Sequence, residues 1–548
     1  MNRKKPALMY VLIALALVIL VAAGFLILRY MPTSRRMDLT EYYGAAQGDE
    51  AVLIIGSEIL EEKGRIYEGQ AYLPLPLVQE RLNPRFYYDE ENGQILYTTP
   101  SAINRSAIDN APGQDAWDTG EEIYLRLDYI KRFTDLDSII YMNPYRVAIQ
   151  NKFEDITVTT ARRKGCVRYL GGIKSEVLTE VTQGQTLLYL EDWGDWVKVA
   201  TWDGYIGYIE ANKVTLPTKV GMDRTFEEEA CSYLKAAEPV ALAWHNIAFY
   251  EANAYLADLL SNTDGMNVIC PTWFYLSGQQ GDFEDLSSED YVAEAHAAGL
   301  SVWGLLENIS AENDLHQTLS RMSSRQALIQ GLLSAANRLG LDGINIDFEV
   351  MEPETIPHFL EFLRELSIET HRAGIILSVD DPVPESYSAY YRRDEQGRAV
   401  DYLIIMGYDE HYDGDVEAGS VASLPWVEQG IIDTVAEVPA SRVINAVPFY
   451  TRIWRTQNGA LYSEVLSMDE AIQAVLANDA QSYWNNDVSQ VYASWQNEGS
   501  KYEVWVEDAD SIAAKTALVK KYNLAGIAAW RLGLESDGIW EVIRQGLQ

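Results

Sequence analysis

The chain has 548 residues, of which 48% are hydrophobic and 11% are aromatic. This length exceeds what one hydrophobic core usually holds, so we expect two to four domains, and the apolar content argues against a disordered chain. Asp and Glu outnumber Lys and Arg by 81 to 43, which gives a formal net charge of -38. Because such a charge repels the phosphates of nucleic acids, we expect no nucleic acid among the partners of this protein.

An uncharged, apolar stretch occupies residues 7–28. At about 1.5 Å per residue it is long enough to cross the roughly 30 Å of a hydrocarbon core. A cleaved signal peptide is the alternative, but signal cores typically span about 7 to 15 residues, and this stretch continues past the small residues Ala22, Ala23 and Gly24. We therefore predict that residues 1–37 form a cytoplasmic tip and a single membrane anchor. Basic residues flank both ends of the stretch, so charge alone does not orient it.

A region of about a hundred residues follows the anchor. Within it, residues 85–89 and 94–97 have strand character and flank Asn92-Gly93, a dipeptide typical of hairpin turns. Residues 47–152 resemble the small N-terminal stalk domain of copper amine oxidases. The resemblance implies a spacer without catalysis. No histidine precedes His245, which argues against copper ligation in this region.

Short alternating segments separated by glycines occupy residues 180–187, 193–199 and 204–209. This pattern favours a small β-barrel. Residues 164–216 resemble a bacterial Src-homology-3-like domain, which implies a contact with cell-wall peptides. The alternative is that Trp193, Trp196 and Trp202 only fill or cover the small barrel.

From residue 238 to the end, short apolar runs alternate with longer helical patterns. Runs that suit eight strands begin near Val240, Val268, Val302, Gly343, Ile375, Tyr402, Val443 and Gly526. Eight such units predict a (β/α)8 barrel. In the helix before the fourth strand, Ser323 and Gln326 suit a capping box, and Gly340 suits the C-terminal end.

The interval between Tyr450 and Leu524 is wide and contains a predicted hairpin at residues 490–495 and 501–506. It predicts a small α+β insertion rather than a ninth barrel unit. The predicted fold class is therefore an α/β barrel of the TIM type with an α+β insertion at residues 238–548. An all-β Src-homology-3-like barrel, an α+β stalk domain and one transmembrane helix precede it.

Neither cysteine nor histidine indicates a metal site. Cys166, Cys231 and Cys270 have no metal-like spacing, and their odd number cannot form a closed set of disulfides. The six histidines form no helical or turn-spaced cluster. We predict no metal and no cofactor.

The fourth predicted strand ends in the run Asn345, Ile346, Asp347, Phe348, Glu349. Alternate side chains of a strand face the same way, so the polar residues of this run share one face, which lies inside a barrel. Buried carboxylates are costly unless they are paired or functional, and barrel enzymes place their chemistry at the carboxyl ends of the strands. The alternative is the solvated face of an antiparallel sheet.

These residues resemble the Asp-x-x-Asp-x-Asp-x-Glu signature of family 18 glycoside hydrolases, with Asn345 at the position of the second aspartate. Residues 406–409, Met-Gly-Tyr-Asp, and Trp530 match where the family would place them after the sixth and eighth strands. The likeness covers about the last three hundred residues. It is strongest to the spore-germination and cortex-lytic branch, in which a Trp-x-Glu-Asp segment such as residues 505–508 occurs and which cleaves peptidoglycan at N-acetylglucosamine.

The resemblance implies a mechanism in which the 2-acetamido oxygen of the substrate is the nucleophile. Glu349 would be the proton donor, Asp347 would hold the acetamido N–H, and Tyr408 would hydrogen-bond the acetamido oxygen. The residues that would bind substrate are Asp342, Asn345, Met406, Asp409 and Trp530. An amide cannot ionise, so Asn345 could not relay charge from Asp342 toward Asp347, and we expect an altered pH dependence. Further candidates for the cleft are His245, Glu307, Asp380 and His411.

The leading hypothesis is a single-pass protein of the cell membrane, with an extracellular domain that hydrolyses a glycan containing N-acetylglucosamine. Peptidoglycan is the favoured substrate, because a tethered enzyme meets mainly its own envelope. A chitinase that acts on chitin oligomers is the near alternative. A non-catalytic receptor for cell-wall glycans is the alternative from a different class, and the presence of Glu349 argues against it.

Overall fold

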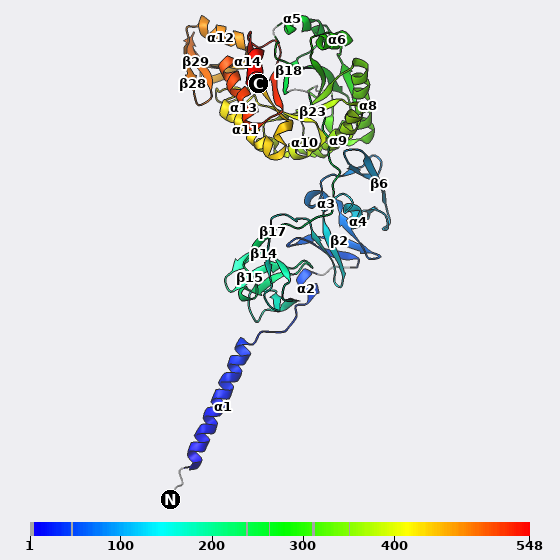
Figure 1. Ribbon diagram of the computed structural model, residues 1–548, viewed down its shortest axis with the longest axis vertical. Coiled ribbons are helices and arrows are strands. Elements are labelled where there is room, and N and C mark those ends of the chain that lie inside the picture. The colour runs from blue at the N-terminus through cyan, green and yellow to red at the C-terminus, as the bar shows by residue number, and fades with distance from the viewer. Residues whose placement is uncertain (1–4, 45–47, 237–238, 262, 310–312, 350) are drawn as a thin grey trace. The chain divides into compact units, whose positions relative to one another are not determined.

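The computed structural model describes residues 5–44, 48–236, 239–261, 263–309, 313–349 and 351–548. The chain splits into two compact units (Figure 1). Unit 1 comprises Met1–Phe86 and Ser106–Glu228, and unit 2 comprises Tyr87–Arg105 and Glu229–Gln548. The predicted domain boundaries at residues 47 and 238 lie outside the described residues, and the predicted domain limits stay predictions.

The predicted apolar stretch is helical. Helix α1 (Lys5–Tyr30) contains a segment, Met9–Tyr30, with a mean hydropathy of 3.2, and none of that segment is buried. By length and composition it could cross a membrane, and a signal sequence would pass the same test. A short helix, α2 (Leu39–Tyr43), follows it.

Unit 1 is built mainly from two sheets. Strand β1 pairs antiparallel with β2 and parallel with β10, so apolar residues of β1 such as Val52 and Leu53 are fully buried. The first sheet runs in the order β6-β7-β8-β3-β2-β1-β10-β9, with short helices α3 (Leu75–Arg81) and α4 (Leu127–Ile130). These strands are β1 (Glu50–Ile55), β2 (Glu58–Tyr67), β3 (Gln70–Pro74), β6 (Ile103–Asp109), β7 (Ala116–Asp118), β8 (Ile123–Arg126), β9 (Asp137–Met142) and β10 (Tyr145–Gln150).

The second sheet of unit 1 has the order β13-β12-β16-β15-β14-β11-β17. Its core contains the apolar side chains of Val167, Leu187 and Val199, each fully buried. The strands are β11 (Ile156–Thr160), β12 (Gly165–Arg168), β13 (Val177–Val181), β14 (Thr186–Trp193), β15 (Trp196–Ala200), β16 (Ile206–Glu210) and β17 (Thr218–Val220). This sheet includes the short strands expected at residues 180–209, and the resemblance to a Src-homology-3-like domain stays a prediction.

Unit 2 contains a closed barrel of eight parallel strands, as predicted. The strands are β18 (Val240–His245), β19 (Val268–Ser277), β21 (Ser301–Glu307), β22 (Gly343–Asp347), β23 (Ile376–Pro382), β24 (Tyr402–Met406), β25 (Val443–Pro448) and β31 (Gly526–Trp530). They pair in the order β18-β31-β25-β24-β23-β22-β21-β19, and the pairing of β18 with β19 closes the ring. Strand β20 (Asp282–Asp285) pairs antiparallel with the outer part of β19.

Strand alternation produces two apolar layers. Inward-facing residues such as Leu242, Leu305 and Ile404 fill the barrel, whereas Ile344 and Ile346 face outward and pack beneath the surrounding helices. The helices that cover the barrel (Figure 1) are α5 (Leu256–Leu260), α6 (Glu289–Ala297), α7 (Leu315–Ser320), α8 (Met322–Leu339), α9 (Ile356–Ala373), α10 (Arg393–Ala399), α11 (Leu424–Glu437), α13 (Ala509–Tyr522) and α14 (Ile539–Leu547).

Helix α8 confirms the predicted C-terminal end but not the predicted capping box. Gly340 takes the left-handed conformation at φ 73°, and its N–H donates to the carbonyl of Ala336. At the other end Arg321 is the N-cap, and the prediction that Ser323 caps the helix was wrong. Instead, the backbone N–H and the hydroxyl of Ser323 donate to the carboxylate of Glu91, at 2.8 Å and 2.5 Å. A distant segment therefore supplies the anion at this helix end.

That segment is the predicted hairpin of β4 (Phe86–Asp89) and β5 (Gln94–Thr98). From Tyr87 onward it belongs to unit 2, where it packs on helices α8 and α9. The Tyr87 hydroxyl lies 2.6 Å from His358 Nδ1 and accepts a hydrogen bond from Arg325 Nη1 at 3.1 Å. The Thr98 hydroxyl donates to the carboxylate of Glu361, which is fully buried.

The insertion after the seventh barrel strand is an α+β layer. Its five strands follow the order β27-β26-β30-β29-β28, and helix α12 (Met468–Ala477) packs on one face through Ala471. The strands are β26 (Tyr450–Gln457), β27 (Ala460–Ser467), β28 (Gln481–Asn485), β29 (Gln490–Asn497) and β30 (Ser500–Val506). The predicted hairpin is β29 and β30; we did not predict the other three strands.

Candidate active site

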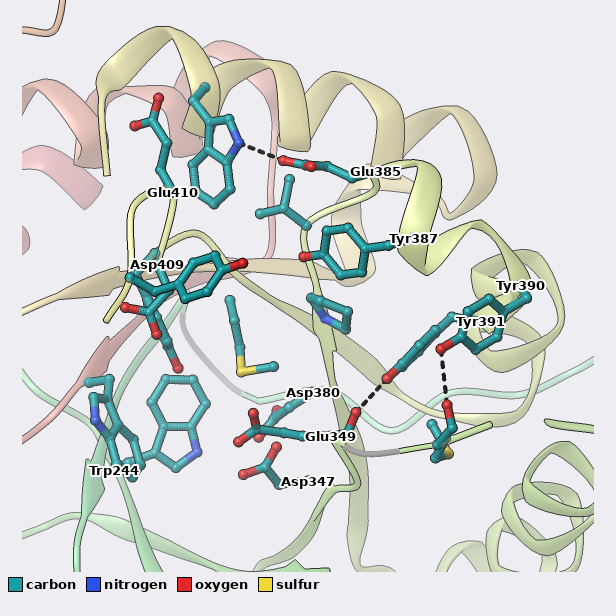
Figure 2. A pocket seen from close by; sticks show the side chains of 18 of the residues that line it. Trp244, Asp347, Glu349, Asp380, Glu385, Tyr387, Tyr390, Tyr391, Asp409 and Glu410 are labelled. Carbon is teal, nitrogen blue, oxygen red and sulfur yellow. Dashed lines mark hydrogen bonds between the residues drawn. The ribbon is translucent and has the colours of Figure 1, made fainter. Parts of the chain in front are cut away.

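An open cleft of about 680 Å³ lies at the carboxyl ends of the barrel strands. Carboxylates and aromatic rings dominate its lining (Figure 2). The acidic lining residues are Asp347, Glu349, Glu352, Asp380, Glu385, Asp409 and Glu410, and the aromatic ones are Trp244, Tyr387, Tyr390, Tyr391, Tyr408, Tyr412, Trp426, Tyr450 and Trp530. Such a lining suits a neutral, hydroxyl-rich ligand that stacks on rings and accepts and donates hydrogen bonds.

Two carboxylates at the end of β22 form the floor of the cleft. Asp347 is buried, and its Oδ1 atom has no hydrogen-bond partner among the described residues. The Glu349 side chain points into the open cleft, while its backbone is fixed on both sides. Its N–H donates to Asn308 Oδ1 at 3.1 Å, and its carbonyl accepts from the Tyr391 hydroxyl at 2.6 Å. A fixed backbone that directs an acid into the cavity is suited to proton transfer.

Burial and neighbouring negative charges raise the pKa values of both carboxyl groups at the cleft floor. Burial raises the pKa of Asp347 well above its ordinary value, and the charges of Asp380 and Glu349 raise it further. Desolvation by the cleft walls also raises the pKa of Glu349, and Asp409 adds to this effect. A raised pKa extends the protonated form of Glu349 toward neutral pH, which is the form a general acid needs.

The structure does not bring Asn345 into the cleft, although the sequence suggested that it binds substrate. Asn345 is fully buried one row below Asp347. Its Oδ1 accepts from the Trp244 indole at 3.1 Å, and its Nδ2 donates to Asp380 Oδ1 at 2.8 Å and to the Ser378 hydroxyl at 2.9 Å. Asn345 therefore positions two cleft residues without contacting the cavity.

Asp342 is also absent from the cleft. It precedes β22, at the end of the barrel opposite to the cleft, because a parallel strand carries its first and last residues to opposite rims. Its Oδ2 accepts from the Val302 N–H at 2.8 Å and lies 2.9 Å from His296 Nε2. The expected substrate contact of Asp342 is thus not supported, and its place is a structural link between barrel strands.

Tyr408, Asp409, Met406 and Trp530 all line the cleft. Asp409 adopts a left-handed φ of 63°, which an Asp tolerates better than most side chains, and its carboxylate accepts from the Tyr450 hydroxyl at 2.6 Å. Burial raises the pKa of Tyr408 well above its ordinary value, so the phenol remains a hydrogen-bond donor. The ring of Trp530 lies 6.0 Å from that of Trp244, and together they form an apolar wall.

Comparison with known proteins decides the class of the domain. Residues 287–535 match the sequence profile described as Glycosyl hydrolases family 18. The barrel is a glycoside hydrolase domain whose sequence matches family 18.

Similar proteins agree with this assignment. The hydrolase is 26% identical to the uncharacterized glycosylase YvbX of Bacillus subtilis over 260 residues. This match covers 45% of this chain and 75% of YvbX. Over 246 residues it is 28% identical to the cortical fragment-lytic enzyme of the same organism; this match covers 43% of this chain and 57% of that protein, little more than half its length.

Two solved structures share the barrel fold. The spore cortex-lytic enzyme SleL of Bacillus cereus matches with a TM-score of 0.52 at 19% identity. The match covers 58% of this chain and 76% of the SleL chain. A chitinase from Chromobacterium violaceum matches with a TM-score of 0.50 at 24% identity. The match covers 56% of this chain and 99% of the chitinase chain.

Four further residues were candidates for the cleft of the hydrolase. Asp380 lines it, and the other three do not. His245 is buried against the Tyr291 hydroxyl at 2.8 Å, and burial lowers its pKa to about 4. His411 lies 3.3 Å from Asp415. Glu307 pairs in register with Asp347 on the neighbouring strand, and burial together with Glu349 raises its pKa to about 7.

Sequence reasoning missed several lining residues of the hydrolase. Trp244 belongs to β18 near its carboxyl end and Tyr450 begins β26 just after β25, so their places beside predicted strand ends could have marked them. The indole N–H of Trp426, in the first turn of α11, donates to the carboxylate of Glu385 at 2.9 Å (Figure 2), and no local sequence pattern predicts this contact.

Proposed function

We propose that the protein is a membrane-anchored hydrolase that cleaves β-1,4 linkages after N-acetylglucosamine in peptidoglycan. The observation that carries the proposal is the pair Asp347 and Glu349 at the cleft floor, both with raised pKa values and both facing the cavity that Tyr408 and Trp530 line. Family membership supports the glycosidase activity, and the substrate and the mechanism are inferred from the site.

In the proposed mechanism Glu349 donates its proton to the glycosidic oxygen as the bond to the anomeric carbon breaks. The 2-acetamido oxygen of the same sugar attacks that carbon, which forms an oxazolinium intermediate with retention after the second step. Asp347, as a carboxylate, accepts the acetamido N–H and stabilises the developing positive charge. A water molecule then opens the intermediate and returns a proton to Glu349.

The other cleft residues hold the acetamido group. The Tyr408 hydroxyl donates to the acetamido oxygen and aims it at the anomeric carbon. Asp409 lines the same subsite and is fixed by Tyr450. Trp530 and Met406 form an apolar surface for the acetamido methyl and the sugar ring.

The cell-wall substrate is supported by two observations. The cortical fragment-lytic enzyme of Bacillus subtilis is among the similar proteins, and helix α1 is apolar enough to hold the chain at a membrane. We place residues 1–37 in and beside the membrane, with the hydrolase on the extracellular side. Residues 164–216 would contact cell-wall peptides.

Product analysis tests the proposal. Residues 38–548 would be incubated with peptidoglycan and with chitin oligomers, and the products identified by mass spectrometry. We expect reducing-end N-acetylglucosamine from peptidoglycan. Glu349→Gln should lower the rate by about 10² to 10⁴, the usual contribution of a general acid. Glu354→Gln is the matched control, because that exposed residue does not line the cleft.

Each other outcome overturns part of the proposal. Cleavage of chitin oligomers alone identifies a chitinase. Binding of peptidoglycan without cleavage identifies a glycan receptor. An unchanged rate in Glu349→Gln excludes this residue as the proton donor.

A further inference from the structure

Carboxylates from three neighbouring strands form one row on the inner face of the barrel. Glu307 of β21 pairs in register with Asp347 of β22. On the other side, Asn345 pairs with Ser378 and Ile346 with Val379, so the next position in that register sets Asp347 beside Asp380 of β23. Adjacent strands lie about 4.8 Å apart, which places Asp347 within reach of both neighbours. Figure 2 shows Asp347 beside Asp380.

Asp380 is held by an amide whose orientation is fixed. Asn345 Oδ1 accepts from the Trp244 indole, so its Nδ2 must be the atom that faces Asp380 and Ser378. Both hydrogens of that amide are then donated, one of them to Asp380 Oδ1. This leaves Oδ1 of Asp380 as an acceptor and Oδ2 as the atom that can carry a proton.

The row cannot be fully ionised. Asp380 is 3% exposed and Asp347 is 7% exposed, and no ion pair with Lys, Arg or His reaches either one within the described part of the chain. Burial and the charge of Asp381 raise the pKa of Asp380, as Asp380 raises that of Asp347. The other titratable groups that interact with the row are Cys270, Glu349 and Tyr408. Tyr391 and Asp409 in turn interact with Glu349.

We propose that Asp380 is a positioning residue that receives the proton of Asp347 when substrate binds, an inference that rests on the proposed function. In the free enzyme the pair shares one proton. On binding, the O–H bond of Asp347 breaks and an O–H bond to Asp380 Oδ2 forms. Asp347 becomes the carboxylate that accepts the substrate's acetamido N–H, and the proton returns when product leaves. The step needs no other reactant.

This relay runs across the sheet, from β22 to β23, instead of along β22. Asn345 then has a defined part in it, because its donated hydrogen bond stabilises the ionised form of Asp380 in the free enzyme and holds the carboxyl beside Asp347. It also explains how a buried carboxylate can sit at Asp380 without a cation: the neighbouring acid supplies the proton that neutralises the pair.

Moving the carboxyl back to β22 tests the relay. In the full chain in detergent, Asp380→Asn should lower kcat about 100-fold with little change in KM, because the loss concerns a step after binding. The double variant Asn345→Asp with Asp380→Asn restores one carboxyl beside Asp347, and we expect it to recover at least about tenfold of that loss.

Asp381→Asn is the matched control. Asp381 is equally buried and is the next residue, but it faces Gln396 and Arg393 on the other side of the strand. This variant should lower thermal stability and leave kcat at its optimal pH close to that of the wild type, although loss of the Asp381 charge lowers the pKa of Asp380. A purely structural role for Asp380 predicts the same behaviour in both single variants, and that result, or a double variant no better than Asp380→Asn, overturns the relay.

Infrared titration separates the relay from the proposed function, because it needs no substrate. The carboxyl band of Asp347, identified by its loss in Asp347→Asn, should titrate at lower pH in Asp380→Asn, since one neighbouring charge is gone. An unchanged titration overturns the relay. A wild-type chain that cleaves neither glycan but shows this shift overturns the proposed function alone.

Discussion

The carboxyl groups at the floor of the cleft have raised pKa values because burial separates them from water. Glu349 raises the pKa values of Asp347 and Asp380, Asp380 raises that of Asp347, and burial is the largest cause for all three groups. The arrangement favours a general acid, but it costs stability whenever the solution pH forces these groups to ionise. Activity and stability therefore depend on pH through the same side chains.

The stability that is lost when a buried carboxyl group ionises can be measured at Glu307, which does not line the cleft. Its pKa in the folded protein is about 7, against 4.5 for an ordinary Glu, so the neutral form stabilises the fold below pH 4.5 and that stability is lost as pH rises through about 7. Relative to wild type, Glu307→Gln should be more stable at pH 8 than at pH 5, by on the order of 2 kcal/mol.

Calorimetry of the barrel transition at both pH values measures this difference. The exposed Glu284 on β20 offers a control substitution, Glu284→Gln, for which we expect no pH-dependent difference. Equal effects of Glu307→Gln at pH 5 and pH 8 would mean that Glu307 ionises normally in the folded protein.

The sequence predicted the site residues that lie on the barrel strands or directly after them. Asp347, Tyr408 and Trp530 fall at or just after strand ends, and parallel strands deliver such residues to one rim. The same rule, applied to the start of the strand, would have removed Asp342 from the site. Tyr391 and Trp426 could not be found, because they reach the cleft from loops and helices whose paths depend on tertiary packing.

Among the elements, the barrel strands were the most predictable. Strands such as β18 and β25 are buried on both faces, so they appear in the sequence as short, nearly continuous apolar runs. The start of α8 was not predictable in this way, because its anion comes from Glu91, more than two hundred residues earlier. Three strands of the insertion were missed because polar residues interrupt their apolar pattern and because β27 and β28 are largely exposed.

The hairpin of β4 and β5 should contribute measurably to the stability of unit 2. Tyr87→Phe removes the hydroxyl that accepts from Arg325 and contacts His358, two groups that have little access to water. Leaving a buried donor without a partner costs about 1 to 3 kcal/mol. We expect a lower Tm for the barrel transition with an unchanged specific activity at low temperature.

Tyr483→Phe is a control for loss of a hydroxyl, because Tyr483 on β28 is 60% exposed. If Tyr87→Phe and Tyr483→Phe changed the Tm equally, the hydrogen bonds of the Tyr87 hydroxyl with α8 and α9 would add nothing to the stability of the fold.

One apolar helix precedes units with a strongly acidic composition. The formal net charge of -38 keeps the chain from anionic lipid headgroups, so attraction to the membrane surface cannot replace insertion of α1. The proposed localisation therefore depends on α1 itself, which could be a retained anchor or a signal that is removed.

A charge in the middle of α1 distinguishes these cases. Leu17→Arg should weaken membrane insertion by about 3 kcal/mol, so the full chain should move from the membrane fraction to the soluble fraction after carbonate extraction. Leu216→Arg is the matched control, since Leu216 is 81% exposed in unit 1 and its replacement should leave the chain in the membrane fraction. Mass spectrometry of the wild-type N-terminus completes the test: a retained Met1 with membrane association supports the anchor. A new N-terminus near Ala23 would instead make α1 a signal sequence, and the hydrolase would then act without a tether.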